Sequence, residues 1–123
     1  MRGIYGIKKA TLESIIIAAR NIYPNEFISM LGGKNGLIEE LVVVPAVFGE
    51  DYSSYNMDMV PIDRGIIGTV HSHPSRYNHP SDEDLDSFSR FGEVHLIISY
   101  PYDLNTIKAF DNKGKKITLR VVE

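Results

Sequence analysis

The chain contains no cysteine among its 123 residues. It therefore cannot form a disulfide framework, a cysteine-ligated zinc site or a cysteine nucleophile, and this composition suits a reducing compartment. Charge of one sign is also scarce, because 13 basic residues stand against 16 acidic ones and the net charge is −3. Nothing in this balance indicates a nucleic-acid-binding or membrane-surface protein. We expect neither nucleic acid nor membrane among its partners.

Long hydrophobic runs are missing as well. The longest wholly apolar runs hold about five residues, whereas a membrane-spanning helix needs roughly 20. The first nine residues, from Met1 to Lys9, lack the apolar core of a signal peptide. The cytoplasm is the expected location. With 43% hydrophobic and 24% charged residues, the chain is typical of one globular domain over residues 1–123.

The periodicity of the apolar residues predicts an α/β protein. Residues 8–23 carry apolar side chains at helical spacing and are followed by Pro24, and a second helix is expected over residues 81–91. Strands are predicted at 26–31, 37–45, 55–60, 65–73, 94–100, 106–111 and 115–122, with a turn at 32–36, a loop at 46–54 and a final hairpin turning at 112–114. This order of helices and strands implies a mixed sheet with helices packed on it.

The most informative motif is His71-Ser72-His73-Pro74 at the end of the apolar strand 65–73. Alternate residues of a strand project from one face, so both imidazoles can reach the same ion. Histidines at strand ends are often hydrogen-bonded core residues instead. Two imidazoles buried on one face without a shared partner, however, would leave polar groups unsatisfied. We therefore favour metal ligands over packing.

An acidic ligand is available in the following helix. Asp84 lies one turn before Phe88, and with Leu85 and Phe88 expected to form the buried stripe, Asp84 should lean inward. Ser81 is expected to cap this helix in a Ser-x-x-Asp capping box and also to serve the site. The remaining acids are expected to be solvated: Asp82, Glu83 and Asp86. Two histidines and one aspartate leave a fourth tetrahedral position for water, as in catalytic zinc sites.

The proton acceptor is not determined by periodicity. The candidates are Glu13, Glu26, Glu39, Glu40 and Glu50. Glu26 is unusual because it opens an apolar strand, although by pattern alone a solvated residue at a strand end is the favoured interpretation. The other histidines receive no role: His79 is expected in a surface loop, and His95 as a satisfied core or edge residue.

Other architectures with two alternate histidines fit poorly. Amidohydrolase-type barrels need about 250 residues. Cupins require a glutamate shortly after the second histidine, where this chain has no acid in residues 75–79. Zinc deaminases require cysteine ligands, which are absent.

The combined pattern resembles the JAMM metalloproteases, the catalytically competent MPN domains. Their signature is an upstream glutamate, then His-x-His-Pro, then Pro-Ser-x-x-Asp; the chain shows Glu26, the motif beginning at His71, and Pro80-Ser81-Asp82-Glu83-Asp84. Ser29 stands where many members have glycine. The resemblance covers residues 8–122 and is greatest to the short archaeal members.

The resemblance implies a three-layer α/β/α sandwich with a mixed sheet, similar to cytidine deaminase. It implies one zinc ion per chain held by His71, His73 and Asp84. Glu26 would be the general base that takes a proton from the catalytic water and delivers it to the leaving amine. Ser81 would hydrogen-bond the oxyanion of the tetrahedral intermediate.

The activity implied by the resemblance is removal of ubiquitin-like small modifiers from lysine side chains, with the modifier and its conjugates as partners. An alternative is a zinc peptidase that trims the C-terminus of a sulfur-carrier protein. A non-catalytic MPN scaffold ranks last, since such scaffolds lack one or more motif residues and this chain has all five. A homodimer is compatible with the sequence, but no segment proves one.

Overall fold

The computed structural model describes residues 3–42 and 65–123. Its elements are, in chain order, β1 (Gly6–Lys8), α1 (Lys9–Ile22), β2 (Ile28–Lys34), β3 (Leu37–Val42), β4 (Ile66–His73), α2 (Asp82–Phe88), β5 (Val94–Ser99), η3 (Leu104–Thr106), β6 (Ile107–Asp111), β7 (Lys116–Ile117) and β8 (Arg120–Val122). The predicted loop 46–54, the predicted strand 55–60 and the end of the predicted strand 37–45 lie outside the described residues. No helix in the described ranges combines the length and apolarity needed to cross a membrane.

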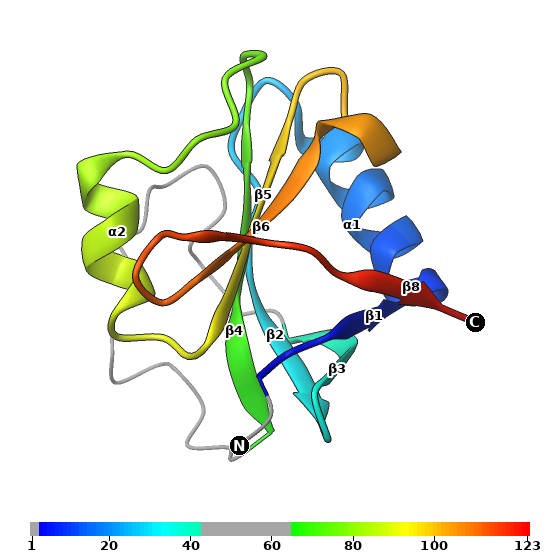
Figure 1. Ribbon diagram of the computed structural model, residues 1–123. Helices are drawn as coiled ribbons and strands as arrows, with labels where there is room; N and C mark the ends of the chain where they lie inside the picture. The colour runs from blue at the N-terminus through cyan, green and yellow to red at the C-terminus, as the bar shows by residue number, and fades with distance from the viewer. Residues whose placement is uncertain (1–2, 43–64) are drawn as a thin grey trace.

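The strands form one mixed sheet in the order β7-β6-β5-β4-β2-β3-β1-β8. Strand β4 lies near the middle, antiparallel to β2 and parallel to β5. The two edge strands, β7 and β8, are joined by only the two residues 118–119. Because so short a connection cannot cross a flat sheet of this width, the sheet curls and its two edges approach each other (Figure 1).

One helix covers each face of the sheet, as expected for three α/β/α layers (Figure 1). Helix α1 buries Leu12, Ile15 and Ala19 in a cluster with alternate residues of the strands. The sheet's contribution to that cluster includes Leu31, Val70, Leu96, Ile98 and Ala109. On the opposite face, Phe88 of α2 packs with Ile97 and Phe110. The predicted α/β class with a mixed sheet is confirmed.

The predicted turn at 32–36 is wrong in its first half. Strand β2 continues through Gly32 and Gly33, which pair with β3 across a bulge. Only Asn35 and Gly36 turn, with φ of 55° and 79°. Positive φ at both central residues is the geometry of a tight two-residue hairpin, which joins long strands more directly than a five-residue turn.

The C-terminal hairpin is only partly as predicted. Residues 107–111 and 116–117 do pair, but Arg120–Val122 leaves the hairpin and pairs in parallel with β1. Strand β1 itself was not predicted, because three residues are too few to show a period. The pairing of β8 with β1 depends on sheet curvature, which local sequence does not encode.

Helix α2 is shorter than predicted, ending at Phe88 rather than at residue 91. The expectation that Leu85 belongs to the buried stripe is wrong, since this side chain is 37% exposed. A helix of seven residues lays only a narrow face on the sheet. Asp84 and Phe88, one turn apart, occupy that face. Leu85 instead covers the turn glycine Gly114.

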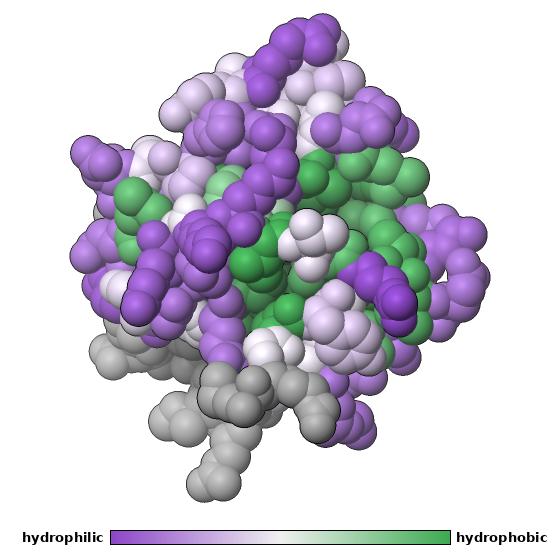
Figure 2. Space-filling model, in the orientation of Figure 1, coloured by the Kyte–Doolittle hydropathy of each residue, from purple (hydrophilic) through white to green (hydrophobic). Residues whose placement is uncertain are grey.

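A groove of about 460 Å³, lined by apolar and polar side chains, opens on the α1 side of the sheet. Figure 2 shows apolar residues gathered on the face where α1 and β8 lie. The groove is lined by side chains from several strands and from η3, among them Ile7, Leu12, Leu104, Ile107, Ile117, Leu119 and Val121. Since α2 lies on the opposite face, this groove is separate from the polar site described below.

We predict that Gly68→Ala lowers the free energy of unfolding by about 3 kcal/mol. A Cβ at this position in β4 would overlap the carbonyl oxygen of Val94 in the parallel neighbour β5. Urea unfolding measures the change. Gly3→Ala is the matched control, because a Cβ there meets nothing within 4 Å. Equal unfolding midpoints for the two variants would contradict the close approach of β4 and β5.

Candidate metal centre

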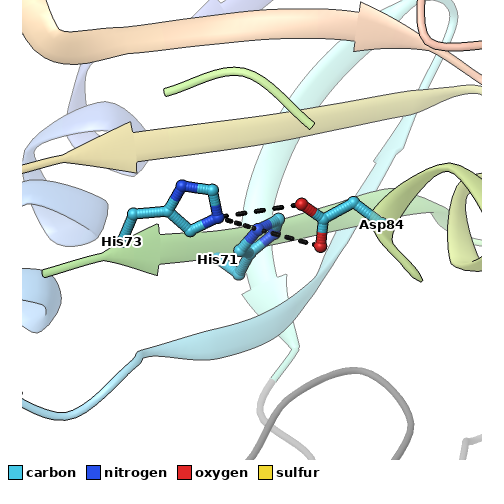
Figure 3. Close-up of side chains that lie close together, drawn as sticks. All are labelled: His71, His73 and Asp84. Atoms are coloured by element: carbon cyan, nitrogen blue, oxygen red, sulfur yellow. Dashed lines mark hydrogen bonds and ion pairs between the residues drawn. The ribbon is translucent and has the colours of Figure 1, made fainter. Parts of the chain in front are cut away.

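Two imidazoles project from the end of β4 toward α2 (Figure 3). His71 and His73 alternate along the strand and share the α2 face, and their Nε2 atoms are 2.9 Å apart. The His71 side chain is buried, and that of His73 is 15% exposed. The strand therefore delivers one ring in the interior and one ring at the rim of the same site.

Helix α2 supplies the third group. The Oδ1 atom of Asp84 lies 3.3 Å from Nε2 of His71, and Oδ2 lies 3.7 Å from Nε2 of His73 (Figure 3). Asp84 is oriented by Ser81, whose backbone N–H donates to Oδ2 at 2.8 Å while its hydroxyl oxygen accepts from the Asp84 N–H at 3.1 Å. The predicted capping role of Ser81 is confirmed. Asp84 is buried and leans inward, also as predicted.

The separations of these atoms fit a tetrahedral ion. Bonds of 2.0–2.2 Å to nitrogen and oxygen place neighbouring ligand atoms roughly 3.3 Å apart. The three observed separations are 2.9, 3.3 and 3.7 Å, centred on that value. His71, His73 and Asp84 thus form a group able to hold a metal ion with little rearrangement. Two imidazoles and a carboxylate are ligands that zinc accepts.

A backbone carbonyl sets the tautomer of His73. Its Nδ1 lies 2.8 Å from the carbonyl oxygen of Tyr77, which can only accept, so Nδ1 carries the proton. In the neutral ring, Nε2 then carries the lone pair and is the atom free to bind a metal ion. Orientation of a ligating histidine through its second nitrogen is the usual arrangement at metal centres. The sequence does not reveal this contact, because a backbone carbonyl acceptor has no residue-type signature.

The charges of the site are strongly coupled. Burial opposes ionisation of Asp84, but hydrogen bonds with His71 and His73 outweigh it and hold the pKa of the carboxyl well below its usual range. Burial is the main influence on His71 and lowers its pKa. At His73 burial is outweighed by Asp84 and the Tyr77 carbonyl, and the pKa is raised. Asp84 is therefore an anion at neutral pH, as a metal ligand must be.

A second serine ties the segment containing Glu26 to the ligand strand. Ser72, fully buried between the two histidines, accepts a hydrogen bond on its Oγ from the Phe27 N–H at 2.8 Å. Its own N–H donates to the Phe27 carbonyl at 2.9 Å. Glu26, which precedes Phe27, is half-buried, and its negative charge contributes to the raised pKa of His73. The structure thus brings Glu26 near the site.

The remaining histidines lie outside the group of ligands. His95 receives a hydrogen bond on Nδ1 from the Thr69 hydroxyl at 2.7 Å and donates from Nε2 to the Gly92 carbonyl at 3.0 Å. Its ring stacks on Phe88 with centroids 4.2 Å apart. The prediction of a satisfied core histidine is confirmed. His79 is exposed, as predicted, with its ring against that of Tyr77.

Comparison with known proteins decides the family. Residues 8–113 match the family model of prokaryotic homologs of the JAB domain. The chain belongs to this family. A protein of Haloferax volcanii named "Probable metalloprotease" is 32% identical to this JAB-domain chain over 133 residues, covering 99% of this chain and 82% of that protein.

Solved structures agree with the JAB-domain assignment. A JAB1/MPN domain protein from Archaeoglobus fulgidus is 37% identical, with a TM-score of 0.78 and 97% of each chain covered. A structure described as "JAMM: A Metalloprotease-like Zinc Site in the Proteasome and Signalosome" is 38% identical, with a TM-score of 0.78 and coverage of 98% and 99%. A Desulfitobacterium hafniense protein, 19% identical with a TM-score of 0.65, shares the fold. The resemblance to the JAMM family is confirmed.

We predict that His71→Ala abolishes stoichiometric zinc binding, because it removes one of the three candidate ligands and leaves the Asp84 charge without its nearest imidazole. Metal content after gel filtration and competition with a chromogenic chelator measure it. His79→Ala is the control, since His79 is an exposed histidine outside the ligand group and should bind zinc as the parent chain does. Full zinc occupancy in His71→Ala would contradict the assignment.

We predict that His95 makes the metal-free protein less stable in acid. Burial lowers its pKa in the folded state to about 4, whereas the unfolded chain has the ordinary value of 6.5. Between these values the unfolded state binds more protons, so the unfolding free energy falls as the pH decreases, by about 2 kcal/mol from pH 6.5 to 5. Urea unfolding across this range should show a shallower pH dependence in His95→Gln. Identical pH dependence in both proteins would contradict the prediction.

Proposed function

We propose that this JAB-domain chain is a zinc metallopeptidase that hydrolyses isopeptide bonds between ubiquitin-like modifiers and lysine side chains. The observation that carries the proposal is the convergence of His71, His73 and Asp84 at tetrahedral spacing beside the segment that holds Glu26. Membership of the JAB family supports it, as does the likeness to a chain named a metalloprotease and to one described by its zinc site.

His71, His73 and Asp84 would hold the ion. When bound, zinc supplies a Lewis acid that polarises the scissile carbonyl and lowers the pKa of water to about 7. Three protein ligands leave room for water and substrate, in contrast to the four of a structural site. The chain contributes the rest of the chemistry through Glu26 and Ser81.

Glu26 is proposed as the general base. Its carboxylate would accept a proton from the attacking water and pass it to the nitrogen of the leaving amine. A positioned carboxylate of this kind typically contributes a factor of 10² to 10⁴ in rate. The hydrogen bonds between Ser72 and Phe27 hold the backbone next to Glu26 against β4. The backbone of the proposed base therefore keeps its position relative to the two imidazoles.

Ser81 is proposed to stabilise the oxyanion. In the helix cap its hydroxyl oxygen acts as the acceptor for the Asp84 N–H, so the O–H proton can still be donated. A single donor to the oxyanion in a site that excludes water is worth on the order of 10² to 10³ in turnover. Because Ser81 and Asp84 are joined by two hydrogen bonds, the Ser81 hydroxyl keeps a fixed position relative to Asp84.

The decisive experiment is cleavage of a ubiquitin-like protein joined to a lysine ε-amine, using zinc-loaded protein with and without a chelator. Cleavage that the chelator stops and that added zinc restores would establish the isopeptidase. Cleavage only of a linear C-terminal extension would favour processing of a sulfur-carrier protein instead. A zinc-loaded protein that cleaves neither substrate would contradict the proposed function.

We predict that Glu26→Gln retains zinc but loses turnover by a factor of 10² to 10⁴, because the amide keeps the shape of the side chain and cannot accept the proton. Zinc content and kcat on the lysine conjugate are measured together. Glu13→Gln, an exposed glutamate on α1, is the matched control and should leave both unchanged. Undiminished kcat in Glu26→Gln would remove Glu26 from the mechanism.

A further inference from the structure

Three tyrosines pack together next to the candidate metal centre. Tyr23 follows the end of α1, and Tyr100 and Tyr102 follow the end of β5. The ring centroids are 5.2 Å apart for Tyr23 and Tyr100, and 5.9 Å apart for each of the other two pairs. These three residues, here called the tyrosine cluster, come from segments almost eighty positions apart in the sequence.

Backbone hydrogen bonds join the tyrosine cluster to the metal ligands. The Tyr100 N–H donates to the carbonyl of His73 at 3.2 Å and to that of Ser75 at 3.0 Å. On its other side, Tyr23 precedes Glu26 by three residues. The Phe27 N–H, next to Glu26, donates to the Ser72 hydroxyl between the two histidines, so the segment from Tyr23 to Phe27 leads from the cluster to the ligand strand.

The tyrosine cluster has two exposed rings that pack on a buried tyrosine with an unusual backbone conformation. Tyr23 and Tyr100 are 47% and 38% exposed, whereas Tyr102 lies beneath at 2%. Tyr102 has a φ of 65°, which is rare for a bulky residue, and its buried hydroxyl has no hydrogen-bond partner among residues 3–42 and 65–123. A buried hydroxyl without a partner is destabilising, and strained backbone of this kind gathers at functional sites. Tyr102 thus belongs to the core beneath α1, while the two exposed rings pack against it at the surface.

The position of the cluster decides which part of a substrate it would meet. Ser81, proposed to hold the carbonyl oxygen, lies at the start of α2 on one side of the ligand group. Glu26, proposed to protonate the leaving nitrogen, lies next to Phe27, which is bonded to Ser72 of β4, and is three residues from Tyr23 of the cluster. A scissile amide that reaches both groups therefore directs its nitrogen, and the chain attached to that nitrogen, toward the tyrosine cluster.

We propose that the tyrosine cluster is the leaving-group subsite and that it receives the four-carbon side chain of the lysine that is released. The inference rests on the proposed function and adds to it the chemistry of the leaving group. An unbranched alkyl chain can lie flat on the faces of Tyr23 and Tyr100. The guanidinium carbon of Arg76 lies over the Tyr100 ring, 5.7 Å from its centroid, in a cation–π contact.

Hydrolysis of the isopeptide bond consumes one water molecule, and each of its atoms is accounted for. The amide C–N bond breaks, the hydroxyl of water joins the modifier's carbonyl carbon, and the proton that Glu26 carried goes to the lysine nitrogen. An α-linked peptide would place a backbone Cα and its next amide against the rings, with no long alkyl chain to cover them. The cluster should therefore favour ε-linked over α-linked conjugates.

The test compares two substrates that differ only in linkage: the same modifier joined to the ε-amine or to the α-amine of one lysine-containing peptide. Zinc-loaded parent protein is assayed beside Tyr23→Ala and Tyr100→Ala. Tyr5→Ala is the matched control, because Tyr5 is also 47% exposed but lies against Gly36 in the turn between β2 and β3 rather than against the cluster. Zinc content and melting temperature are measured for every variant.

The expected result is a rise of about tenfold in KM for the ε-linked substrate in both cluster variants, with the α-linked substrate and the Tyr5→Ala variant unaffected. Tyr100→Phe, which keeps the ring, should restore the parent KM. Unchanged KM, or equal losses on both linkages, would overturn the subsite while leaving the isopeptidase intact. A parent protein that cleaves neither linkage would overturn the proposed function and the subsite together.

Discussion

Antiparallel pairing of β2 with β4 is the constraint on which the site depends. Strand β4 carries both imidazoles, and the register places Ile28 opposite His71. One step further, the hydroxyl of Ser72 takes the Phe27 N–H, so the chain leaves the ladder at Glu26 while still fastened to the strand between the two histidines. A shift of register by one residue would turn both imidazoles to the α1 face. The pairing of β2 with β4 thus determines which side chains face the site as well as where the site lies.

Two histidines buried on the same face of the sheet have their polar nitrogens satisfied in different ways. His95 and His71 lie on neighbouring strands and both are buried. The protein satisfies both nitrogens of His95 with a hydroxyl and a carbonyl, and that residue serves packing. At His71 the nearby atoms are ligand atoms of His73 and Asp84, all converging on one point. An ion at that point would neutralise the carboxylate and satisfy the lone pairs together.

Much of the fold and of the ligand group could be predicted from local pattern. The helix at α1, the strand carrying the histidines and the hydrophobic strand β5 all show their period within a few residues. The capping hydrogen bonds between Ser81 and Asp84 span three positions and can therefore be recognised from the sequence. The buried face of helix α2 was harder to predict, because a helix of seven residues shows less than two full turns of periodicity. The prediction that Leu85 is buried was wrong.

By itself, the sequence determined the chemical nature of the site: two histidines on one strand face and an aspartate one turn into a capped helix, without any thiol. Tertiary structure brings the segment of Glu26 to them, since Phe27 and Ser72 are 45 positions apart and no local rule joins them; Glu50, another candidate, lies outside the described residues. It also decided the curl that pairs β8 with β1 and the meeting of Tyr23 with Tyr100 and Tyr102. Such contacts arise from chain segments brought together by packing, whereas helical and strand periods arise from neighbours.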